Sequence, residues 1–227
     1  DISLPGTLHA HVVRSPHAHA AIVSIDASRA RSLAGVAAVL TGEDTDHLSY
    51  LPSSGPSTPP EVRSATSSTP GPGVPATPSH PEPRHPLLAG ERVRYVGQPV
   101  AVVVAAERYL ARDAADLIEV EYEVLEAVLD VREAMKEGAP QLHADMTTQE
   151  FGEDTGKTSN LATHFQHKLG DPDQAFASAD VVIEREFSTA TVHQGYIEPH
   201  NATAMWNSDG QITVWTSTQG SFTARAQ

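Results

Sequence analysis

Short apolar runs alternate with polar turn residues along most of the chain, and their spacing predicts a mixed α+β fold. Residues 7–14 and 20–26 carry the pattern of two strands joined by a turn. Ser28 is a candidate N-cap for a short helix over residues 29–33, and an apolar run at 36–41 predicts a third strand. The first part of the chain is therefore expected to form a β-β-α-β unit.

A second set of periodic segments follows further along. Residues 100–106 are continuously apolar, which is typical of a strand covered on both faces. Residues 107–117 have helical spacing, and the stripe that includes Tyr109 is expected to pack on the sheet. Strict alternation over residues 118–125 predicts a half-exposed strand. Its water-facing residues are Glu119, Glu121 and Glu123.

Two stretches lack this periodicity and suggest how the chain is divided. Residues 52–86 hold eleven of the seventeen prolines and are predicted to be a loop, because proline lacks the amide donor that a central strand needs. Residues 146–160 are polar and are predicted to connect two bodies. The expected domains are residues 1–145 and residues 161–227.

The block after the connector is expected to be rich in strands. Residues 162–169 and 181–190 are predicted strands on either side of a helix over 171–179, which Asp171 would cap. A turn at residues 207–210 is expected to join the last two strands as a hairpin.

Composition and charge exclude several functions. The chain has 29 acidic and 15 basic side chains, a net charge of -14, so it is poorly suited to replace the counterions of a nucleic acid. It has no cysteine, which rules out disulfides, thiolate zinc sites and iron–sulfur clusters held by cysteines of this chain, and which fits a reducing cytoplasm. No apolar run approaches the roughly 20 residues of a membrane-spanning helix. A soluble, cytoplasmic chain is expected.

The most distinctive polar run lies near the end, from His193 to Trp206, followed by Gln219 beside a glycine. On a strand, Glu198 and His200 would share a face, which suits either a hydrogen-bond pair behind a cofactor or a buried structural pair. The Gln219 amide could donate a hydrogen bond to a ligand, or it could satisfy backbone groups in a turn.

Four histidines near the start raise the question of a metal. His9, His11, His17 and His19 form two i, i+2 pairs around the first turn, and alternate strand residues point the same way. Neutral imidazoles serve equally well as packed, hydrogen-bonded side chains. We expect a structural role and no metal bound by this chain.

Two regions resemble one family, the xanthine dehydrogenase and aldehyde oxidase family of molybdenum hydroxylases. Residues 8–20, which contain Arg-Ser-Pro-His-Ala-His, resemble its α/β-hammerhead domain, as do residues 33–44 and 93–105. Residues 170–219, which contain Tyr-Ile-Glu-Pro-His, resemble the opening of its molybdopterin-binding domain. The resemblance implies a hammerhead domain followed by a strand-rich part of a molybdopterin-binding domain, as in the bacterial carbon monoxide, nicotinate, aryl-CoA and aldehyde oxidoreductases.

The same resemblance implies a chemistry. The cofactor would be a molybdenum-pyranopterin, as molybdopterin cytosine dinucleotide or a related form, and electrons would leave through iron–sulfur and FAD subunits. Gln219 matches a family glutamine that donates to an oxo ligand of the metal. The family's Gly-rich cofactor loops and catalytic glutamate find no match up to Gln227, so we expect another segment or chain to supply them. The alternative is a noncatalytic scaffold subunit, or a truncated fragment, that binds partner chains without cofactor.

Overall fold

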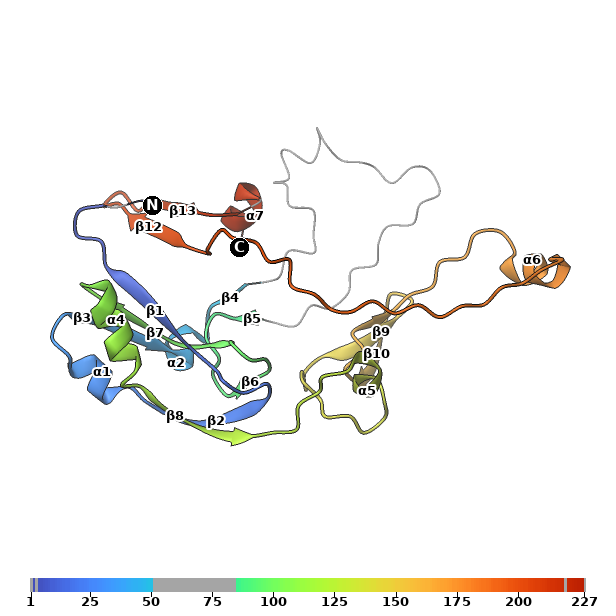
Figure 1. The fold of residues 1–227 in the computed structure, drawn as a ribbon, viewed down its shortest axis with the longest axis horizontal. Helices are drawn as coiled ribbons and strands as arrows, with labels where there is room; N and C mark the ends of the chain where they lie inside the picture. Colours follow the sequence, from blue (N-terminus) through green and yellow to red (C-terminus); the bar gives the residue numbers. More distant parts are fainter. Residues whose placement is uncertain (1, 3, 51–84, 219, 227) are drawn as a thin grey trace.

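The computed structural model describes residues 2, 4–50, 85–218 and 220–226 (Figure 1). Its first core forms around strand β7 (Pro99–Ala105), which lies between β1 (His9–Arg14) and β3 (Val36–Thr41) in an antiparallel sheet. Val100, Ala101 and Val103 of β7 are fully buried. The predicted doubly covered strand is confirmed, because the alternate side chains of β7 enter two different apolar clusters.

Helix α4 (Arg108–Ala115) covers one face of this sheet and contacts β1 and β7. It buries Ala111, Ala114 and Ala115, whose small side chains let the helix approach the strands closely. Tyr109 was predicted to lie in the packed stripe, but its side chain is 78% exposed. The two-turn helix buries only its alanine face, and Tyr109 projects from the other side.

A second antiparallel sheet lies next to the first, and we call the two sheets with α4 the first body. Strand β2 (Ala20–Asp26) lies between β6 (Arg92–Val93) and β8 (Glu119–Val124). Ile25 and Val120 pack against both apolar clusters, so the two sheets share one continuous core. The water-facing glutamates of β8 are exposed as predicted.

Helix α1 (Ser28–Ser32) begins one residue before its predicted start, so Ser28 is not the N-cap. Ala27 holds that position, and the Asp26 carboxylate accepts the Ser28 N–H at 2.9 Å. The Ser28 hydroxyl, followed by this backbone hydrogen bond, lowers the pKa of Asp26. The Asp26 carboxylate therefore accepts a backbone N–H at the start of the helix, a role that we expected the Ser28 hydroxyl to fill.

The proline-rich loop lies mostly outside the described residues, which resume at residue 85. The last two residues of the predicted loop, His85–Pro86, form strand β5, which pairs with β4 (Ser49–Tyr50). Proline is tolerated here because a two-stranded ribbon leaves one side of each strand without a partner. Helix α2 (Gly42–Thr45) precedes β4 and carries a capping box between Thr41 and Asp44.

The polar connector at 146–160 contains two strands that the sequence did not predict. Strand β9 (Thr147–Glu150) pairs with β10 (Glu153–Thr158) and with β11 (Thr163–His164). Phe151 and Gly152 both have positive φ, 52° and 89°, which produces the tight turn between β9 and β10. Helix α5 (Val131–Ala134) precedes this sheet and is capped by the Asp130 carboxylate. The predicted domain bounds themselves stay a prediction.

The remaining chain has little regular structure beyond short local elements. Helix α6 (Pro172–Ser178) is capped by Asp171 as predicted, and β12 (Ala202–Trp206) pairs with β13 (Ile212–Thr216) in the predicted hairpin. Helix α7 (Ser221–Ala226) was not predicted.

The predicted strand at 181–190 does not form, and β11 is much shorter than the predicted strand at 162–169. Figure 1 shows an extended segment that runs out to α6 and back toward the first body. No described strand pairs with residues 181–190, so their backbone groups have no neighbouring strand to hydrogen-bond with.

The close approach of Gly42 to the backbone of residues 89–90 provides a test of this fold. A Cβ on Gly42 would lie 2.5 Å from the Gly90 Cα and 2.6 Å from the Ala89 carbonyl oxygen, which cannot move away as a flexible side chain could. We expect Gly42→Ala to lower the free energy of unfolding by about 1–3 kcal/mol in urea denaturation of the full chain. Gly90→Ala is the matched control, because its Cβ meets nothing within 4 Å. Equal stability of the two variants would contradict this packing.

Candidate functional site

The hairpin β12–β13 brings together the two C-terminal regions that the sequence singled out. Its register runs from Trp206 opposite Ile212 to Ala202 opposite Thr216. Beyond the last pair, the Thr216 hydroxyl donates to the Asn201 carbonyl at 3.2 Å, and the Ser217 hydroxyl lies 3.4 Å from the Pro199 carbonyl. The end of the Tyr-Ile-Glu-Pro-His run is therefore held against the residues that lead to position 219.

The loop before β12 is not the strand that we predicted for Glu198 and His200. Gly195 has a φ of 70°, and Pro199 lacks the amide that a ladder would need. The hydrogen bond of the His200 ring is to a residue four positions earlier. The Tyr196 hydroxyl and His200 Nε2 are 2.6 Å apart, and the two ring centroids are 5.1 Å apart. Residues 198–200 therefore do not form the predicted strand, and the role of Glu198 and His200 behind a cofactor stays a prediction.

Gln219 itself lies outside the described residues, so its role stays a prediction. Among its described neighbours, the Gly220 N–H donates to the Thr218 hydroxyl at 3.2 Å. Ser217 and Thr218 follow β13, and Gly220 directly precedes α7. The described neighbours of position 219 are therefore small or polar residues between a strand and a helix.

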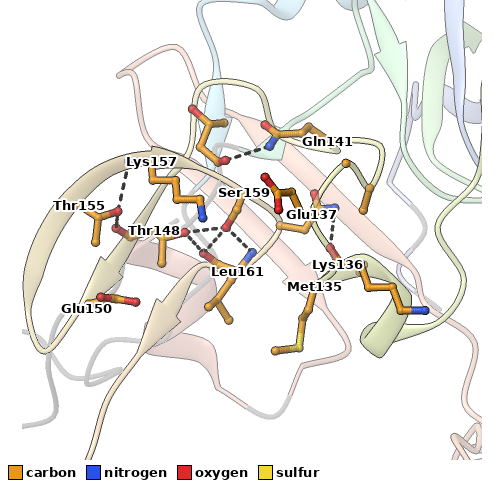
Figure 2. Close-up of a pocket in the computed structure, with 15 residues that line it drawn as sticks. Met135, Lys136, Glu137, Gln141, Thr148, Glu150, Thr155, Lys157, Ser159 and Leu161 are labelled. Carbon is orange, nitrogen blue, oxygen red and sulfur yellow. Dashed lines mark hydrogen bonds between the residues drawn. The ribbon is translucent and has the colours of Figure 1, made fainter.

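A cavity of about 720 Å³ lies between α5 and the sheet of β9 and β10 (Figure 2). Asn160 lines this cavity and binds three backbone groups between residues 134 and 142. Its Nδ2 donates to the carbonyls of Ala134 and Pro140, at 3.1 and 2.9 Å, and its Oδ1 accepts the Leu142 N–H at 3.1 Å. One side chain therefore fixes the chain before β9 against the chain after β10.

Hydroxyl groups hold the inner side of the same cavity. Thr148 is 5% exposed, and its hydroxyl lies 2.6 Å from the Ser159 hydroxyl and 2.7 Å from the Leu161 carbonyl, as Figure 2 shows. The Lys136 ammonium is paired with Glu133 at 2.6 Å. Because these hydroxyl and charged groups bond to one another, this side of the cavity has the chemistry of a structural junction.

Arg94 links the first body to this junction. Its Nε donates to the Leu142 carbonyl at 2.6 Å, and Gln98 Oε1 accepts its backbone N–H. Partial burial lowers the pKa of Arg94, and burial, followed by the nearby Arg94 charge, lowers the pKa of His143. His143 is therefore neutral at pH 7, which keeps a second positive charge away from Arg94.

The four N-terminal histidines are separated by the fold. His19 is 4% exposed, and its Nδ1 donates to the Glu126 carbonyl at 2.7 Å, since a carbonyl can only accept. The His17 ring contacts the Tyr122 ring edge-on, at 4.9 Å between centroids. His9 and His11 are exposed. In the part of the chain that the structure describes, no three metal-ligating side chains form a cluster.

Two family profiles match the chain in the order that the motifs indicate. The profile described as "Aldehyde oxidase and xanthine dehydrogenase, a/b hammerhead domain" matches residues 1–62 and 65–126. The profile described as "Molybdopterin cofactor-binding domain" matches residues 153–227. The chain belongs to the aldehyde oxidase and xanthine dehydrogenase family.

Individual relatives agree with this membership. The carbon monoxide dehydrogenase large chain of Afipia carboxidovorans is 36% identical over 221 residues, covering 95% of this chain and 24% of that protein. The nicotinate dehydrogenase large molybdopterin subunit of Eubacterium barkeri is 30% identical, covering 96% and 42%. The crystal structure of quinoline 2-oxidoreductase from Pseudomonas putida 86 superimposes with a TM-score of 0.70 at 32% identity, covering 96% and 24%.

The chain spans about a quarter of the length of the first curated relatives that it matches. None of the helices among the described residues is long and apolar enough to cross a membrane.

The Asn160 junction gives a second test. Asn160→Ala removes three hydrogen bonds and leaves part-buried backbone groups unpaired, so we expect a loss of about 1–3 kcal/mol in the free energy of unfolding. Hydrogen exchange in the full chain should rise at β9 and β10. Gln141→Ala is the matched control, because this exposed amide makes a single hydrogen bond, to the Thr158 carbonyl. If both variants exchange alike, Asn160 does not hold the junction.

Proposed function

We propose that this chain is the hammerhead and first molybdopterin-binding part of a molybdenum-dependent hydroxylase or dehydrogenase. The observation that carries the proposal is the order of the two profile matches, a hammerhead followed by a molybdopterin cofactor-binding domain. The relatives' names support carbon monoxide or a nitrogen heterocycle as the substrate. An aldehyde or an aryl-CoA stays a prediction from the sequence. The enzyme would act in the cytoplasm.

The residues around position 219 suit such a cofactor. A pyranopterin supplies its own sulfur ligands to the metal, so the protein needs hydrogen-bond donors there and no cysteine, and this chain has none. The Thr218 hydroxyl, which accepts the Gly220 N–H, can still donate its own proton, and the sequence adds the Gln219 amide. When bound, the cofactor would accept two electrons from the substrate. This chain would hold only one side of it.

Gln219 is proposed to donate its amide N–H to an oxygen ligand of the metal. An amide does not titrate near neutral pH, so it can orient that oxygen without competing for the proton that leaves the substrate. The Gly-rich loops and the catalytic glutamate of the family would come from another segment or chain. Electrons would pass to iron–sulfur and FAD subunits of the same complex.

A second candidate function is a scaffold that binds partner chains without cofactor. The extended segment favours it, because Phe187 and Ile197 are 87% and 97% exposed and offer apolar surface for contact.

The enzyme and the scaffold would differ in the metal content of the purified complex. We expect the native complex, purified through this chain, to contain about one molybdenum per chain by elemental mass spectrometry and to release a fluorescent pterin on denaturation. A complex without either would favour the scaffold.

Replacement of the proposed donor gives a direct prediction. In the assembled enzyme we expect Gln219→Ala to retain molybdenum and pterin and to lower kcat by about 10²–10³-fold, the usual effect of removing one preorganised donor. The measurement is steady-state turnover with metal content on the same samples. Gln211→Ala, an amide in the turn before β13, is the matched control and should keep its kcat. Unchanged turnover in Gln219→Ala would remove Gln219 from the site.

A further inference from the structure

The backbone of Leu142, between α5 and β9, is held from two sides by side chains. Its carbonyl accepts the Arg94 Nε–H at 2.6 Å, and its N–H donates to Asn160 Oδ1 at 3.1 Å. Arg94 directly follows β6 in the first body, whereas Asn160 lies just after β10. The first body and the β9–β10 sheet are therefore joined here, by a contact that we call the Arg94–Leu142 link.

His143 is the next residue in the chain and is half-buried beside this link. Three titratable or charged groups lie close enough to act on its ring: Arg94 in the first body, His85 on β5 and Asp145 in the same loop. The Arg94 guanidinium is a permanent cation, and protonation of His85 would add a further positive charge. Of the three, Asp145 is the one that attracts a charged imidazole. The surroundings of His143 therefore favour the neutral ring.

The charge of His143 links the stability of this contact to pH. Burial, followed by the Arg94 charge, lowers the pKa of His143 below its ordinary value of 6.5, and Asp145 opposes this effect without cancelling it. If the link opens, the ring enters water and regains its ordinary pKa, so opening takes up a proton below about pH 6.5. The closed state is therefore fully stable well above pH 6.5, and its stability falls as the pH drops from there toward the lowered pKa.

We propose that the Arg94–Leu142 link is a pH-sensitive junction between the first body and the β9–β10 sheet, closed while His143 is neutral and loosened when His143 is protonated. Protonation would place a second cation near Arg94 in half-buried surroundings, where like charges repel more strongly than in water. Movement of the loop away from Arg94 would let water hydrate both cations. The inference does not depend on the proposed molybdenum function.

The first measurement is amide hydrogen exchange of the full chain at about pH 7.5 and about pH 5.5. Results are expressed as protection factors, so that the intrinsic pH dependence of exchange cancels. We expect protection in residues 142–150 and in β10 to fall by about 3–10-fold at the lower pH, since one pH unit below the ordinary pKa the opening can gain at most about tenfold. Strand β7 is the internal reference, because its protection depends on the core of the first body.

Replacement of His143 by a neutral side chain tests whether this residue is the sensor. His143→Gln cannot be protonated, so we expect wild-type protection at about pH 7.5 and a loss of no more than about twofold at about pH 5.5. His167→Gln is the matched control, because His167 is an exposed histidine beyond β11, and it should keep the wild-type pH dependence. His85→Gln should keep most of it, because His85 has the smallest effect on His143 among its neighbours.

A proton NMR titration of the wild-type chain gives a test that needs no variant. The His143 imidazole should titrate with a midpoint below 6.5. The proposal would be overturned by a midpoint at or above this value, by wild-type protection that does not change between the two pH values, or by a pH dependence that persists in His143→Gln.

Discussion

Burial of β7 on both faces is the interaction on which the first body depends. Its alternate side chains enter two apolar clusters, and the strand pairs on both edges, with β1 and β3. Because Val100, Ala101 and Val103 have no exposed surface, each contributes the full effect of transfer from water. The helices and the second sheet are placed by the need to cover this strand.

The C-terminal part is held together by different interactions from those of the first body. Beyond β11, the described residues include none in the buried class, and order comes from hydrogen bonds within short segments. The Asp171 cap, the β12–β13 ladder and the Tyr196–His200 bond are all of this kind. A two-stranded hairpin of this kind is marginally stable in water by itself. Apolar side chains such as Ile197 bury almost no surface against the described residues and so contribute little to stability there.

Periodicity predicted the elements that a core or a local capping bond fixes. The strand β7, the alternating exposure of β8 and the Asp171 cap could all be predicted from the sequence, because each depends on residues within a few positions. The strand predicted at 181–190 failed because apolar, β-branched residues favour a strand only when a partner supplies the ladder. The strands β9 and β10 were missed because their residues are polar and their turn uses Phe151 at positive φ, which composition does not indicate.

The location of the candidate site stays a prediction, and its side-chain contacts could not be predicted from the sequence. A strand over the Tyr-Ile-Glu-Pro-His run would have placed His200 beside Glu198, two residues away. In the structure the His200 ring instead bonds to Tyr196, four residues away. The signals against a strand were Gly195 and Pro199, since the first permits positive φ and the second removes an amide donor. Because this segment is a loop, residues four positions apart can meet, and the Tyr196 hydroxyl lies within hydrogen-bonding distance of the His200 ring. The Asn201 and Pro199 carbonyls of the same segment accept the Thr216 and Ser217 hydroxyls at the end of β13, so this segment is tied to the hairpin by side chains as well as by the ladder.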